Sequence, residues 1–218
     1  MELLPIYLSA LVLGTAHALE PDHLAAVTAF VVRRPRPLHA AGFGARWAIG
    51  HGAAIFAVGV LLLIAGRSIP DGWTSLLDRV VGLAMIGLGV WTLVTAKTVH
   101  AHSHTHTDGT THTHPHAHAR GGEHGHAHAA TGFGLLHGLA GTGPAVALIP
   151  LLSLRSPREG AVYLFLFGVG TAVGMTAYAL LAGVLAARLA RGSGTFSKTV
   201  STVAGLFAML VGFIWLLR

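Results

Sequence analysis

Long apolar stretches alternate along this chain with short polar connectors. Six stretches are long enough for a helix to cross a bilayer, which takes about 17 to 25 mostly apolar residues: 3–32, 42–65, 80–96, 131–152, 160–187 and 200–217. The connectors hold Arg, Pro, Gly and Asp, which are typical of turns and loop ends. The pattern therefore predicts an all-α integral membrane protein with six transmembrane helices.

Composition supports a membrane protein. Hydrophobic residues make up 53% of the 218 positions and charged residues 10%, whereas a soluble domain carries roughly a quarter charged residues. Cysteine is absent, which excludes a disulfide scaffold, an iron–sulfur cluster and a Cys-ligated zinc site. The basic residues behind the net charge of +6 lie in short clusters between apolar stretches, as in membrane proteins. We therefore expect contact with membrane lipids and no binding of nucleic acid.

The distribution of Lys and Arg predicts the orientation. The first, third and fifth connectors hold eight of these residues, whereas the other connectors and the carboxyl terminus hold five. Because positive loops stay in the cytoplasm, we expect the amino terminus outside and the third connector inside. The expected location is the cytoplasmic membrane, with several passes.

The two halves of the chain resemble each other. A shift of 120 to 124 residues places His17 on His137 and Trp91 on Trp215. Each half holds three predicted spans, an odd number, so the second half would enter the membrane from the opposite side. Such a three-plus-three inverted repeat is typical of secondary transporters, whose sites lie near the midplane at broken helices. During transport, one half of the protein would then rock against the other half.

This division gives a first repeat over residues 1–98, a loop over 99–130 and a second repeat over 131–218. The loop has no apolar face, so we expect it to be disordered without metal. Its histidines alternate with small residues, a composition typical of metal capture, although a solvated linker is the alternative. Eleven of the sixteen histidines lie here: His100, His102, His104, His106, His112, His114, His116, His118, His124, His126 and His128.

The first span contains an unusual group of polar residues: His17, Glu20, Asp22 and His23, with Pro21 among them. Ionisable groups inside a span are costly and usually face a partner or a cavity. Pro21 has no N–H for the carbonyl of His17, so we expect the helix to break between these two residues. On a continuous helix, His17 and His23 would point about 120° apart. A break would let them converge with Asp22 and would free backbone carbonyls.

Two imidazoles and one carboxylate form a site that suits divalent nickel, cobalt, zinc or iron, and that does not favour copper(I) or calcium. The ion would be cargo, so no prosthetic group is expected. The alternative is a capped helix start, with Asp22 as an amino-terminal acid and both histidines hydrogen-bonded to neighbours. That alternative explains one acid well, but it explains two histidines in lipid poorly.

Other residues are candidates to complete the site. His51 lies between two glycines, which allow another backbone to approach closely, although it could instead bond a neighbouring carbonyl. In the second half we expect His137 and the Thr142 hydroxyl to contribute, with a break in the fourth span at residues 138–144. Glu20 is a second carboxylate, a hydrogen-bond partner of a ligand, or a partly solvated acid.

The run from His17 to His23 fits the pattern His-x4-Asp-His, which resembles the signature of the nickel/cobalt transporter (NiCoT) family. The Gly-His-Gly at residues 50–52 and the His-rich loop agree with this resemblance. Residues 136–144 are similar to the compact urease-accessory branch, and the chain has six predicted spans where family members commonly have about eight.

The resemblance implies a permease for Ni²⁺ or Co²⁺, with His17, Asp22 and His23 as its binding and selectivity residues. It also implies urease or other nickel-enzyme maturation proteins as partners. Zinc as the cargo and efflux as the direction stay open. Because no ATP-binding motif is present, we expect coupling to an ion gradient or to another subunit.

Two other functional classes compete with transport. An intramembrane metal-dependent oxidase or hydroxylase would need more fixed histidines than the four in the spans, which are too few for a typical two-metal centre. A metal sensor would act through the loop without moving the ion. A homo-oligomer is also open, because the small residues Gly134, Gly138, Gly170 and Gly174 could pack helices within one chain or between two.

Overall fold

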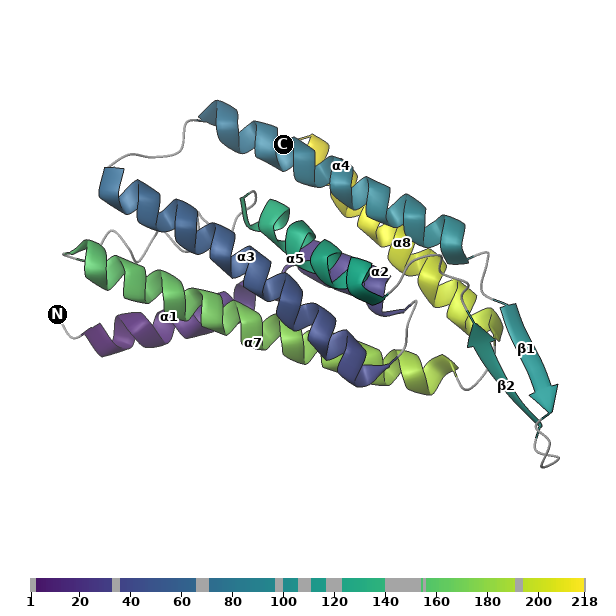
Figure 1. The fold of residues 1–218 in the computed structure, drawn as a ribbon. Helices are drawn as coiled ribbons and strands as arrows, with labels where there is room; N and C mark the ends of the chain where they lie inside the picture. The colour runs from purple at the N-terminus through teal and green to yellow at the C-terminus, as the bar shows by residue number, and fades with distance from the viewer. Residues whose placement is uncertain are drawn as a thin grey trace.

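The computed structural model describes residues 3–32, 36–65, 71–96, 100–105, 111–116, 123–139, 154, 156–190 and 194–217. Helices predominate in this part of the chain (Figure 1). They are α1 (Leu3–His17), α2 (Pro21–Val31), α3 (Pro37–Ala65), α4 (Asp71–Ala96), α5 (Glu123–Leu139), α7 (Pro157–Ala190) and α8 (Gly194–Leu216). Two strands, β1 (His100–Thr105) and β2 (Thr111–His116), form a hairpin.

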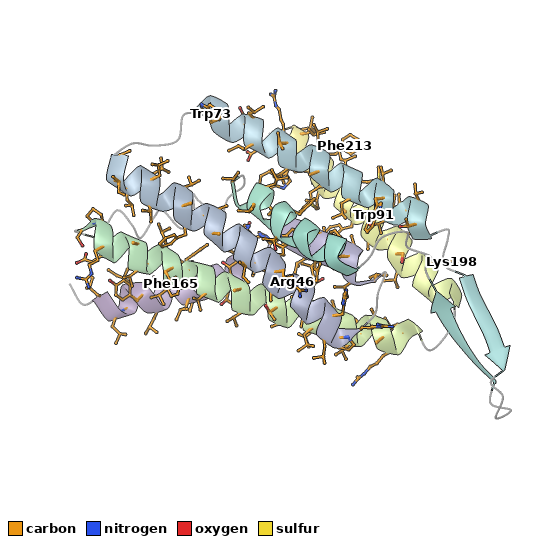
Figure 2. The ribbon with its side chains drawn as sticks, in the orientation of Figure 1. Arg46, Trp73, Trp91, Phe165, Lys198 and Phe213 are labelled. Atoms are coloured by element: carbon orange, nitrogen blue, oxygen red, sulfur yellow. The ribbon has the colours of Figure 1, made fainter. Side chains whose placement is uncertain are left out.

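Several of the described helices are long and apolar enough to cross a membrane. Four single helices meet this condition, with α1 and α2 together making up to a fifth span. Large apolar side chains project from these helices, among them Trp73, Phe165 and Phe213, which are 62%, 61% and 53% exposed (Figure 2). An apolar surface of this kind faces lipid, so the chain is an all-α multi-pass membrane protein. Of the predicted span 131–152, the structure describes only 131–139, within α5.

The predicted break in the first span is confirmed. Helix α1 ends at His17, α2 begins at Pro21, and the two axes differ by 55°. Proline suits the first turn of α2, where its missing N–H costs no hydrogen bond. The expectation of freed carbonyls is wrong at His17, whose carbonyl oxygen accepts the N–H of Glu20 at 3.0 Å. A tight turn therefore satisfies the backbone that the proline would otherwise leave unpaired.

Helix α2 lies inside the bundle and contacts α4, α7 and α8. Most of its side chains are buried, including both ionisable residues of its first turn, Asp22 and His23. Farther along α2, the hydroxyl groups of Thr28 and Tyr178 lie 2.6 Å apart and link α2 to α7. This packing holds the first turn of α2 in the interior.

The most extensive helix contacts join the two halves of the chain. They are α3 with α7, α4 with α8, α3 with α5 and α1 with α7. Each pair takes one helix from residues 1–98 and one from residues 123–218. Figure 1 shows α3 and α5 running in the same direction and α4 and α8 in opposite directions. The halves are interlocked, so the expected rocking of one half against the other would separate these pairs.

Close approaches at glycine recur at corresponding places in the two halves. A Cβ atom at Gly14 would overlap the carbonyl oxygen of Phe167, and one at Gly134 would overlap that of Trp47. A shift of 120 residues relates the two contacts: Gly14 corresponds to Gly134 (134 − 14 = 120) and Trp47 corresponds to Phe167 (167 − 47 = 120). The interfaces α1–α7 and α5–α3 therefore have the same contacts, with the two halves exchanged.

The same exchange holds at the α4–α8 interface. A Cβ atom at Gly82 or at Gly212 would lie 2.8 or 2.6 Å from the carbonyl oxygen of the other glycine. Gly89 and Gly205 oppose each other in the same way. The shift is 123 residues, since 205 − 82 = 123 and 212 − 89 = 123.

The four glycines that left an oligomer open pack within the chain. Gly134 and Gly138 of α5 face α3, and Gly170 and Gly174 of α7 face α1. These contacts use the small residues inside one chain, so they no longer indicate an interface between two chains.

Within the loop that we expect to be disordered without metal, the structure describes two strands and the start of a helix. Strands β1 and β2 pair antiparallel, with a register that sets His100 against His116, His102 against His114, and His104 against His112. The physical reason is the alternation of histidine with small residues, which has the two-residue period of a strand. Helix α5 begins at Glu123, before the predicted loop boundary at residue 130.

Candidate metal-binding site

Five ionisable side chains from four helices meet inside the bundle. His17 ends α1, Asp22 and His23 open α2, His51 lies midway along α3, and His137 lies near the end of α5. None is more than 4% exposed. The structure thus brings together the three residues predicted from the first span and the two histidines predicted to join them.

Two pairs of donor atoms in this cluster lie close together. His17 Nε2 and His51 Nε2 are 3.0 Å apart, as are His137 Nε2 and Asp22 Oδ2. Donors that bind one ion at about 2.0–2.1 Å lie roughly 2.9–3.4 Å apart when the angle at the ion is about 90–110°. Both separations fit two ligands on one ion, and they also fit hydrogen bonds between neutral rings or from ring to carboxylate.

His23 occupies the centre of the cluster. Its ring centroid lies 4.7 Å from that of His17, 4.9 Å from that of His51 and 4.6 Å from that of His137. Its Nε2 atom is buried and has no hydrogen-bond partner among the described residues. An unsatisfied polar atom is costly in an apolar interior, and a metal ion is a partner that would satisfy it.

Asp22 supplies the negative charge of the cluster. Its Oδ1 atom accepts the backbone N–H of His23 at 2.9 Å, and its Oδ2 atom lies beside His137. A buried carboxylate is tolerated when it is hydrogen-bonded or paired with a cation. Four imidazoles and one carboxylate can therefore hold a divalent cation and reduce its charge.

Glycines bring helices α3 and α5 together at the cluster. A Cβ atom at Gly138 would overlap the carbonyl oxygen of His51, and one at Gly50 would overlap that of Thr131. Without these side chains, α3 and α5 approach at backbone distance. That approach places His51 and His137 in one cluster, with ring centroids 5.9 Å apart.

Glu20 has a supporting position. It precedes α2 with an extended backbone (φ −65°, ψ 149°), and its side chain is 27% exposed. Its Oε1 atom lies 3.1 Å from His17 Nδ1. A carboxylate on the far nitrogen of a ligating histidine fixes the ring orientation and raises the basicity of the ring.

The structure does not describe every predicted residue. Thr142, His106 and His118 are outside the described residues, as are the side chains of His124, His126 and His128. The remaining loop histidines, His100, His102, His104, His112, His114 and His116, lie in the β1–β2 hairpin.

Two aromatic residues at the cluster were not anticipated. The Phe167 ring lies 5.5 Å from His17 and the Trp47 ring 5.9 Å from His137. A shift of 120 residues relates both the histidines and the aromatic residues, since 137 − 17 = 120 and 167 − 47 = 120. An alignment of the halves at this single shift would have found them.

Comparison with known proteins places this chain in a family. Residues 9–214 match the family described as the cytochrome C biogenesis protein transmembrane region. The chain belongs to this family. It is also 30% identical over 215 residues to the urease accessory protein UreH of Bacillus sp. (strain TB-90), covering 96% of this chain and 92% of that protein. The predicted resemblance to the urease-accessory branch is confirmed.

Two further relatives carry names of different kinds. A protein of Methanocaldococcus jannaschii, named provisionally as a nickel/cobalt efflux system, is 29% identical over 185 residues, or 83% of this chain and 76% of that protein. The chloroplast protein FOR GROWTH AND FERTILITY 1 of Arabidopsis thaliana is 27% identical over 203 residues, or 91% of this chain and 55% of that protein. No solved structure matches the chain.

Proposed function

We propose that the protein carries a divalent transition-metal ion, nickel or cobalt, across the cytoplasmic membrane. The observation that carries this proposal is the cluster of four histidines and one aspartate, all buried, at a break in a membrane helix. Ionisable groups inside a span are costly and rare, and they usually mark an ion pathway or a proton pathway. Nitrogen-rich donors with one carboxylate suit nickel and cobalt.

The names of the relatives support the same cargo. One is called a urease accessory protein and another a nickel/cobalt efflux system. Nickel-enzyme maturation proteins are accordingly the proposed partners. Efflux through the same cluster is a second candidate, favoured by the name of the M. jannaschii relative. Neither name describes an enzyme, and the cluster has four histidines, which is thin for an oxidase with two metal ions.

The proposed architecture is six spans in a three-plus-three inverted repeat. It is supported by the glycine contacts, which recur at shifts of 120 and 123 residues. The parallel pairs α1–α7 and α3–α5 exchange under the first shift, as a two-fold axis in the membrane plane requires. Lys and Arg counts favour the amino terminus outside and the His-rich hairpin in the cytoplasm. There the hairpin would capture or buffer the ion, which crosses as cargo with no prosthetic group.

The test is a flux measurement on cells that express the wild type or Asp22→Asn. Uptake and efflux of ⁶³Ni are followed in parallel, which also decides the direction. Asp22→Asn keeps the shape of the side chain and removes its charge, so we expect flux to fall at least about tenfold, or roughly 1.4 kcal/mol. The matched control is Asp78→Asn on α4, the same change at a partly buried acid outside the cluster.

The outcome is read together with protein abundance in the membrane. Equal ⁶³Ni flux in the wild type and Asp22→Asn, at equal abundance, would remove the cluster from the transport path. Equal loss in Asp22→Asn and Asp78→Asn would assign the effect to general destabilisation.

A further inference from the structure

We propose that the cluster provides two overlapping positions for the ion, which share His23, and that the ion passes from one to the other by exchanging its remaining ligands. This inference rests on the proposed function and specifies how the same residues act. It follows from how the donor atoms are grouped, which the sequence did not predict.

The donor atoms fall into two sets. Among the described residues, those within 4.8 Å of one another form two sets of three, His17–His23–His51 and Asp22–His23–His137. Two donors on one ion at about 2.1 Å can be at most about 4.2 Å apart. Each set of three needs only a small contraction to bind an ion, whereas all five donors do not form one set.

The two positions differ in chemistry. The first, called the imidazole position, offers three nitrogen atoms and leaves the ion with its full charge of two. The second, called the carboxylate position, offers two nitrogen atoms and the Asp22 oxygen, which reduces that charge by one. Each is anchored by one pair of donors 3.0 Å apart, His17 with His51 or Asp22 with His137. His23 lies between the pairs, at similar ring distances from three histidines.

Sharing one ligand lowers the barrier to movement. A divalent ion released completely within the bilayer would have neither water nor protein donors, which is costly. If the ion stays on the His23 ring, it can leave His17 and His51 one at a time while Asp22 and His137 replace them. The Nδ1 atom of His23 lies 3.2 Å from Asp22 Oδ1, on the side of the carboxylate position. Two sites of moderate affinity also let an ion both enter and leave, which one tight five-ligand site would oppose.

The test counts ligands in variants that each lack one position. His51→Gln removes a donor from the imidazole position and His137→Gln one from the carboxylate position. His39→Gln is the matched control, an exposed histidine on the same helix as His51. In all of them the eleven histidines of residues 100–128 are replaced by serine, so that bound Ni²⁺ reports on the spans. X-ray absorption spectra then count the imidazoles on nickel and detect a carboxylate.

The two arrangements predict different spectra. With two positions, nickel in His51→Gln has two imidazoles and a carboxylate, and in His137→Gln it has three imidazoles and no carboxylate. With a single five-ligand site, both variants show three imidazoles and a carboxylate, and this result would overturn the proposal. Affinity in both should fall less than in His23→Gln, which should lose more than the roughly 10- to 100-fold expected for loss of an outer hydrogen bond.

Transport in proteoliposomes with the native loop distinguishes this inference from the proposed function. His51→Gln and His137→Gln should each bind Ni²⁺ and yet lose most ⁶³Ni flux, while His39→Gln keeps it. Flux that depends on Asp22 and His23 but comes with single-site spectra refutes only the two-position arrangement. Flux that is unchanged in His23→Gln refutes both.

Discussion

The close approach of α5 to α3 at Gly138 holds two of the cluster's histidines together, so Gly138→Ala should damage the site without touching any donor atom. A Cβ atom there would lie 3.0 Å from Ala54 Cβ and 3.0 Å from His51 Cα. Ordinary van der Waals contact begins at 3.4 Å, so α5 must withdraw by at least 0.4 Å (3.4 − 3.0 = 0.4). The carbonyl oxygen of His51, which the new atom would overlap, demands a larger shift.

This displacement sets the expected magnitude. Overpacking of a tight interface costs about 1–3 kcal/mol, and the better helix propensity of alanine offsets about 1 kcal/mol of this cost. We therefore expect a net loss of stability of up to about 2 kcal/mol. His137 moves with α5, so its contact with Asp22 and its distance from His51 both change. We expect Ni²⁺ affinity to fall about tenfold, which corresponds to roughly 1.4 kcal/mol.

The same helix offers a matched control. A Cβ atom at Gly132 would meet nothing within 4 Å, so Gly132→Ala should leave Ni²⁺ binding unchanged and should not lower stability. Both variants are purified in detergent, and thermal unfolding and Ni²⁺ titration are measured side by side. If Gly138→Ala unfolds and binds Ni²⁺ like Gly132→Ala, backbone contact at this glycine does not hold the site together.

Two further predictions concern the second helix pair and the residue beside His17. Gly212→Ala should lower the melting temperature, because its Cβ atom would lie 2.6 Å from the Gly82 carbonyl oxygen; the control is Gly87→Ala, where nothing lies within 4 Å. Equal melting temperatures for the two variants would contradict the proposed tight α4–α8 contact. Glu20→Gln should weaken Ni²⁺ binding about tenfold without abolishing it, because the glutamate supports the His17 ring from 3.1 Å. Complete loss of binding would instead make Glu20 a direct ligand.

The break at Pro21 could be predicted because its cause is local. A proline cannot donate to the carbonyl four residues earlier, wherever the helix lies. The correspondence of His17 with His137 could also be predicted, because a single shift of 120 residues aligns the two histidines (137 − 17 = 120). The hairpin was not predicted, because the low complexity of residues 99–130 favours disorder, whereas the two-residue alternation of histidine also permits strand pairing.

The grouping of the donors could not be obtained from the sequence. Residue spacing placed His17, Asp22 and His23 near one another, but the bend of 55° between α1 and α2 decides which atoms meet. It brings His17 to His51 and leaves Asp22 beside His137. The central place of His23 depends on four helices at once, so no local pattern encodes it.

Apolar length, proline chemistry and internal repetition together specified a membrane protein with a broken first span and a buried group of histidines. These properties depend on short segments. The transfer of apolar residues from water to lipid and the hydrogen bonding of the backbone act on each segment separately. Packing decided the remainder: the glycines face helices of the same chain, the two halves interlock, and His23 lies between two donor pairs. Those features depend on backbones that are distant in sequence and meet at contact distance, and only the folded chain brings them there.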